Sequence, residues 1–168
     1  MRWMTLCLLV AFGCSSSSSA PEPSAPGKDS ALETPEPSEP GGGRADVRAV
    51  TVSGQAGAYT FAVELSSPDT GCEQYANWWE VVRPDGTLVY RRILGHSHVD
   101  EQPFTRSGGP VEIAADDIVL VRAHMHPRGY GGKVVRGSVE VGFAELEQTS
   151  DFAAELARSQ PLPDGCAF

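Results

Sequence analysis

All four histidines of the chain fall into two His-x-His pairs, His96 with His98 and His124 with His126. In a β-strand, residues i and i+2 project from the same face, about 6.5–7 Å apart. Each pair could therefore converge on one metal ion, and imidazole suits zinc and copper. The pattern predicts a transition-metal site on these four histidines. The alternative is that they are surface residues at the ends of two strands.

The residues after the first pair extend this prediction. Asp100 and Glu101 follow His98 closely and could bind the same ion or orient an imidazole. If the strands that carry the two pairs run in the same direction, both pairs lie at one end of the fold. One intervening strand would then separate them by roughly 10 Å. A metal-dependent enzyme with Glu101 as general base is a less favoured alternative.

Two adjacent tryptophans are the other candidate binding residues. Trp78 and Trp79 fall on a predicted strand and therefore point to opposite faces. One is expected in the core, and the other could stack on a sugar or peptide together with Tyr75, although core packing is the commoner use of such residues. The chain has no nucleophile elbow, phosphate-binding loop or metalloprotease helix, which favours a binding protein over an enzyme.

The elements that would position these residues are predicted to be strands. From about residue 45, short segments rich in Val, Ile, Tyr and Thr alternate with Gly, Pro and Asp turns. About seven strands predict an all-β fold, an immunoglobulin-like or related β-sandwich, with a small barrel as the alternative. A hairpin turn is expected at 83–86 and a short C-terminal helix from Ser150. The predicted strands are 47–52, 59–65, 77–82, 87–98, 111–114, 118–126 and 137–143.

The N-terminal residues have the pattern of a targeting signal. Arg2 precedes an apolar stretch of about ten residues, which is too short to span a membrane and typical of a signal peptide. Residues 11–14 resemble a bacterial lipobox, in which Gly13 precedes the acylated cysteine, here Cys14. The resemblance implies that residues 1–13 are removed and that lipid on Cys14 anchors the protein in a membrane. Ser15 after the cysteine implies the outer membrane, by analogy with enterobacterial lipoproteins.

A tether is predicted between this signal and the folded domain. Residues 15–44 contain 8 Ser, 6 Pro and 4 Gly, a composition that cannot bury enough apolar surface to fold. We therefore expect a disordered tether at 14–44 and one β-sandwich domain at 45–168. The whole chain has 22 acidic and 13 basic residues, a net charge of -9, which argues against nucleic acid as a partner.

The remaining cysteines predict a disulfide. Cys7 would leave with the signal peptide and Cys14 would be acylated, so Cys72 and Cys166 remain in an oxidising compartment. Closing a loop of about 95 residues would stabilise the fold by roughly 4–5 kcal/mol. The sequence thus predicts a lipid-anchored cell-envelope protein with a non-enzymatic binding domain, whose ligand could be zinc or copper. A structural or protein-interaction module without a small ligand is the alternative.

Overall fold

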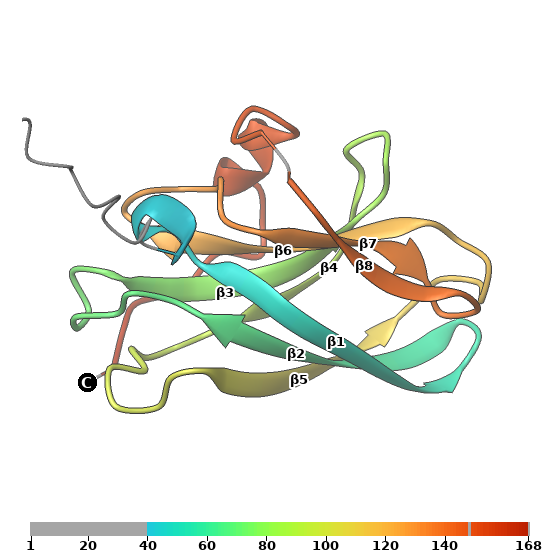
Figure 1. Ribbon diagram of the computed structural model, residues 1–168, viewed down its shortest axis with the longest axis horizontal. Coiled ribbons are helices and arrows are strands. Elements are labelled where there is room, and N and C mark those ends of the chain that lie inside the picture. Colours follow the sequence, from blue (N-terminus) through green and yellow to red (C-terminus); the bar gives the residue numbers. More distant parts are fainter. Residues whose placement is uncertain (1–39, 148, 168) are drawn as a thin grey trace, which may run out of the picture. The chain divides into compact units, whose positions relative to one another are not determined.

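The computed structural model describes residues 40–147 and 149–167. The predicted signal peptide, Cys14 and nearly all of the predicted tether lie outside these residues. Two antiparallel sheets pack face to face, as the two layers in Figure 1 show, which confirms the predicted all-β sandwich. Among the described residues, none of the helices has the length and apolar character to cross a membrane.

The two sheets contain three and five strands. The smaller sheet has the order β1-β2-β5, and the larger sheet has the order β4-β3-β6-β7-β8. Short 3-10 helices lie at Pro40–Gly43 (η1) and Ala154–Arg158 (η2). The strands are β1 (Asp46–Gln55), β2 (Ala58–Ser66), β3 (Tyr75–Val82), β4 (Leu88–Ile93), β5 (Phe104–Val111), β6 (Val119–His126), β7 (Val134–Ser138) and β8 (Gly142–Leu146).

The core lies between the sheets and is built from alternate strand residues. Phe61 and Val63 of β2 face Trp79 of β3 and Val121 and Met125 of β6, and all five are fully buried. Burying each such side chain contributes roughly 1.5–3 kcal/mol. These inward-facing strand residues thus hold the two layers together.

The predicted hairpin at 83–86 is confirmed, because β3 and β4 pair antiparallel around it. The strand predicted at 111–114 is wrong, since β5 occupies residues 104–111, which read as a loop rich in Ser, Gly and Pro. Its glycines are needed for close packing. A Cβ at Gly108 would lie 2.6 Å from the Tyr90 hydroxyl, and one at Gly109 would lie 2.6 Å from the Tyr59 carbonyl oxygen.

Three other predicted elements differ from the structure. The strand expected at 137–143 is divided by a turn into β7 and β8, because Gly142 has a φ of +84° that lets the chain reverse. The strand expected to continue to His98 ends at Ile93. The C-terminal helix is the short η2, which begins after Ala153 without a side-chain cap, so Ser150 is not its N-cap.

The outer face of the five-stranded sheet is covered by the C-terminal segment (residues 149–167), drawn in orange-red and red in Figure 1. The carboxylate of Glu80 accepts hydrogen bonds from Arg91 and Arg122 at 2.8 and 2.7 Å, and all three side chains are buried. The two guanidinium groups then donate to five backbone carbonyls of the segment, at Phe152, Ala153, Leu156, Ser159 and Pro161. A buried charge cluster therefore holds the segment on the sheet.

Candidate functional site

One histidine pair lies in a strand of the five-stranded sheet and the other in the loop after another strand of that sheet. Strands β4 and β6 both pair antiparallel with β3, so they run in the same direction on either side of it. One intervening strand was predicted, but that strand is β3 and not the segment near residue 111. His124 and His126 are in β6, whereas His96 and His98 lie in the loop that follows β4.

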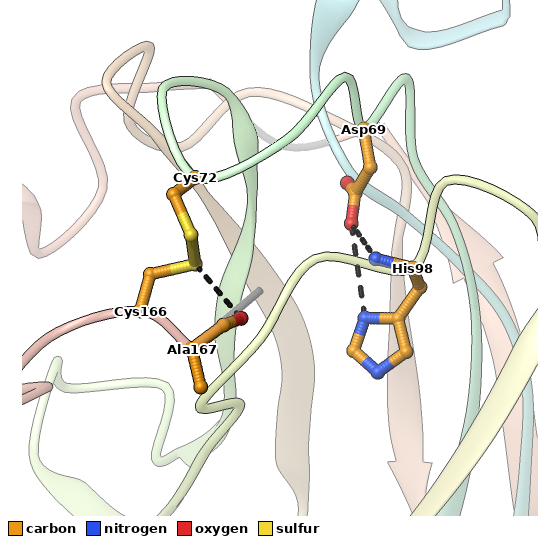
Figure 2. The surroundings of a disulfide bond; sticks show 5 residues. All are labelled: Asp69, Cys72, His98, Cys166 and Ala167. Atoms are coloured by element: carbon orange, nitrogen blue, oxygen red, sulfur yellow. Dashed lines mark hydrogen bonds and ion pairs between the residues drawn. A yellow bond between two sulfur atoms is a disulfide. The ribbon is translucent and has the colours of Figure 1, made fainter.

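Three chain segments meet at this end of the sandwich: the loop 67–74, the loop 94–103 and the end of the C-terminal segment. A disulfide joins Cys72 to Cys166, with Cα atoms 5.6 Å apart, which confirms the predicted bridge (Figure 2). The next residue, Ala167, donates its backbone N–H to the Gly95 carbonyl at 2.7 Å. The bridge therefore ties the C-terminal segment to the loop 67–74, and the Ala167–Gly95 hydrogen bond ties it to the loop that carries the first histidine pair.

Asp69 makes a second connection between the same loops. One of its carboxylate oxygens accepts the backbone N–H of Ala76 at 2.9 Å, and the other accepts that of His98 at 2.8 Å. The second oxygen also lies 3.7 Å from Nδ1 of the His98 ring, as Figure 2 shows. Asp69 thus fixes the backbone of His98 and places a carboxylate near its ring without a hydrogen bond to it, a role that nothing in the sequence pattern indicated.

The first pair lines a cavity of about 530 Å³, formed by His96, Ser97, His98, Val99, Asp100, Glu101 and Ala167. The His98 ring is buried and stacks on Phe104, with ring centroids 3.7 Å apart. His96 is exposed, and its ring centroid is 4.4 Å from that of His98. Both ring nitrogens of His98 and the Ser97 hydroxyl oxygen are buried without a hydrogen-bond partner. Two of the residues that line this cavity, Ser97 and His98, therefore carry buried polar atoms that the protein leaves without a hydrogen-bond partner.

The second pair lines a separate cavity of about 420 Å³ between β3, β6 and the C-terminal segment. His124 stacks on Trp78, with centroids 3.8 Å apart, and its Nδ1 is 2.7 Å from the Asn77 side-chain oxygen. His126 is exposed and pairs across the strands with Tyr75. Cys166 lines this cavity and Ala167 lines the first one, so the chain end separates them.

The electrostatic surroundings of the two buried histidines differ. Burial lowers the pKa of His98, and Arg106 and His96 lower it further, while Asp69 and Glu101 act in the opposite direction. Burial lowers the pKa of His124 to about 3, and the charges of Arg91 and Arg122 add to this effect. His124 is therefore neutral at physiological pH and lies in a positive field.

These positions bear on the predicted metal site. His98 is held on Phe104 and His124 on Trp78, so the four histidines do not meet around one point. In the described parts of the chain, no three His, Cys, Asp or Glu side chains are arranged to hold a metal ion. The structure therefore gives no support to one ion held by His96, His98, His124 and His126 together.

The aromatic binding platform is also absent. Trp78 and Trp79 are 2% and 0% exposed, and Tyr75 is 4% exposed. Trp79 lies in the core, and Trp78 is covered by the His124 ring and by the Arg91 guanidinium, which lies 4.4 Å from the indole centroid. The commoner interpretation, core packing, is therefore correct for these residues.

Sequence reasoning missed the residues that organise this end of the molecule. Glu80, Arg91 and Arg122 are buried charges within apolar strand segments, which was the available signal. A charged residue flanked by Trp79 and Val81 on a strand with both faces covered needs a buried partner. Asp69 and Asn77 gave no such signal, because their partners come from distant segments.

The fold and site define a disulfide-bonded β-sandwich with two small cavities at one end. No protein-family model matches the chain, and no solved structure is similar to it. A protein of Halomicrobium mukohataei described as a "Putative lipoprotein" is 35% identical over 113 residues, which are 67% of this chain. The matched region is 56% of that protein, so this chain spans little more than half of its length.

Proposed function

We propose that this chain is a lipid-anchored protein of the cell envelope that presents a non-enzymatic β-sandwich binding domain. The observation that carries the proposal is the 35% identity to a protein named as a lipoprotein. The matched length of 113 residues exceeds the 44 residues before the predicted domain, so most of the similarity falls on the sandwich itself. The Cys72–Cys166 disulfide supports an oxidising location outside the cytoplasm.

The proposed anchor is Cys14, exposed as the new N-terminus when residues 1–13 are removed. Each buried methylene of an acyl chain contributes about 0.8 kcal/mol to membrane binding, and stable anchoring takes two or more chains. The proposed tether at 14–44 would hold the domain at 45–168 away from the lipid surface. Binding as the role of that domain is supported by the two cavities and by the unpartnered polar atoms in the first.

The anchor is tested by metabolic labelling with an alkyne fatty acid in cells that express the wild type or Cys14→Ser. We expect label on the wild-type protein and its recovery in membranes. Cys14→Ser should carry no label. If its apolar N-terminal segment is not cleaved and holds it in the membrane, the protein runs as a larger band than the cleaved wild type, which distinguishes this case from acylation. Density-gradient separation of inner and outer membranes tests the outer-membrane location. Equal labelling of both proteins would contradict the proposal.

A further inference from the structure

We propose that the His96–His98 pair alone binds a divalent first-row transition-metal ion, with copper(II) bound most tightly, and that the His124–His126 pair does not. This inference rests on the proposed binding role of the domain. Two imidazoles would be the protein's fixed ligands, and water would complete the coordination. Among divalent ions of this series, imidazole sites favour Cu²⁺ over Zn²⁺ and Ni²⁺.

The unpartnered atoms of His98 are the first observation. Its side chain is 1% exposed, yet neither ring nitrogen has a hydrogen-bond partner. Leaving a buried polar group unsatisfied costs about 1–3 kcal/mol, and two such atoms lie on one ring. The adjacent Ser97 hydroxyl is in the same state. A ligand that accepts a nitrogen lone pair would remove part of this cost.

The spacing of the two rings is the second observation. Imidazoles bind such ions at a metal–nitrogen distance of about 2.0–2.1 Å. Two imidazoles bound to one ion at right angles therefore have ring centroids roughly 4.5 Å apart. The centroids of His96 and His98 are 4.4 Å apart. The rings already have the separation of a pair bound side by side. His96 is the exposed member of the pair.

Asp69 supplies the third observation. One carboxylate oxygen lies 3.7 Å from His98 Nδ1 and accepts the backbone N–H of His98, while the other oxygen accepts that of Ala76. A carboxylate next to one imidazole nitrogen favours the proton there, which leaves the lone pair on Nε2 for an ion. Such partners of ligating histidines are common, and they fix the orientation of the ring.

Charge distinguishes the first pair from the second. Asp69, Asp100 and Glu101 surround the first pair, and the nearby Arg106 is paired with Glu101 at 2.7 Å. The second pair faces Arg91, Arg122 and Arg44, of which Glu80 offsets one charge. Asp69 and Glu101 thus offset part of the positive charge at the first pair, whereas the charges at His124 all disfavour a cation, so a cation is repelled less from the first cavity than from the second. The two pairs have the same spacing in sequence and different surroundings in the fold.

The test is copper binding by the full-length protein, purified without a histidine tag and freed of metal by a chelator. Isothermal titration with Cu²⁺ gives the stoichiometry and affinity, and electron paramagnetic resonance reports nitrogen ligands. The variants are His96→Ala, at an exposed position, and His98→Phe, which can still stack on Phe104. The matched control is His126→Ala, which removes an exposed histidine of the other pair.

We expect one Cu²⁺ per wild-type chain, coordinated by two imidazole nitrogens. Loss of a residue that only orients a metal ligand typically weakens metal affinity about 10- to 100-fold. His96→Ala and His98→Phe remove ligands themselves, so each should weaken Cu²⁺ binding by at least this much. His126→Ala should bind as the wild type does. His98→Phe should also keep or raise the thermal stability of the metal-free protein, because it removes two unsatisfied nitrogens.

Three results would overturn the inference: no Cu²⁺ bound by the wild type, unchanged affinity in His96→Ala, or equal weakening in His96→Ala and His126→Ala. If His98→Phe does not fold, His96→Ala decides the outcome. A protein that is acylated at Cys14 but binds no Cu²⁺ would refute only this inference. Copper binding by protein that is never acylated would refute only the proposed anchor.

Discussion

Glu80 is the residue on which the C-terminal segment depends most directly. Its carboxylate lies between Arg91 and Arg122, and all three side chains are buried. Glu80→Gln would leave two buried guanidinium groups without a counter-charge, which typically costs 3–5 kcal/mol, so we expect a loss of about that size. Urea unfolding measures it. The control Glu145→Gln removes an exposed partner of Lys133 and should leave the midpoint near that of the wild type.

If Glu80→Gln unfolds at the same urea concentration as the control, the charge cluster does not hold the segment. The arginine–carbonyl bonds would then be sufficient without the carboxylate.

His124 gives the metal-free protein a predicted sensitivity to acid. Its pKa in the fold is lowered to about 3, whereas an unfolded histidine titrates near pH 6.5. The unfolded chain therefore binds the proton more readily. Stability from this group is fully present above about pH 6.5 and is lost as pH falls toward about 3, at up to about 1.4 kcal/mol per pH unit. His98, with its lowered pKa, acts in the same direction.

The measurement is urea unfolding at pH 7.5 and pH 5 in buffer containing a chelator. His124→Gln removes one titrating group, so its free energy of unfolding should fall less between the two pH values than that of the wild type. The carboxylates with lowered pKa, such as Asp117, titrate mainly below this range. Equal losses in the two proteins would mean that His124 is not the sensitive group.

At the scale of elements, the disulfide fixes the chain end against two loops. The bridge spans 94 residues, so removing it should cost roughly 4–5 kcal/mol by the chain-entropy argument. We expect the double variant Cys72→Ser, Cys166→Ser to show this loss in urea unfolding. Amide hydrogen exchange should also become faster at Ala167, whose N–H is bonded to Gly95. A reductant should lower the stability of the wild type and not that of the variant; equal effects would contradict this.

The elements also indicate how far the sequence could predict this fold. β2 follows from alternating apolar residues, β3 and β6 follow from their β-branched, aromatic and other apolar residues, and the hairpin at 83–86 follows from its turn residues. β5 could not be predicted in this way, because Ser107, Gly108 and Gly109 are poor strand formers. The two glycines are required there because a Cβ would clash with Tyr90 or Tyr59. The turn between β7 and β8 could not be predicted for the opposite reason, because Val139 and Val141 are good strand formers that lie in the turn.

The candidate site was predictable in its residues and not in its arrangement. The histidine spacing identified all four imidazoles, and strand direction brought both pairs to one end. Which pair could attract a cation depends on Asp69 and on the Glu80 cluster, which reach the histidines from distant parts of the chain. Such contacts are set by packing, so sequence spacing alone could not distinguish the two pairs.

For the whole molecule, we propose that lipid on Cys14 anchors this β-sandwich in the envelope. Mass spectrometry of the N-terminal peptide from the mature, membrane-derived protein tests it most directly. We expect a peptide that begins at Cys14 and carries the mass of attached acyl chains. A mature protein that begins at another residue, or an unmodified Cys14, would contradict it.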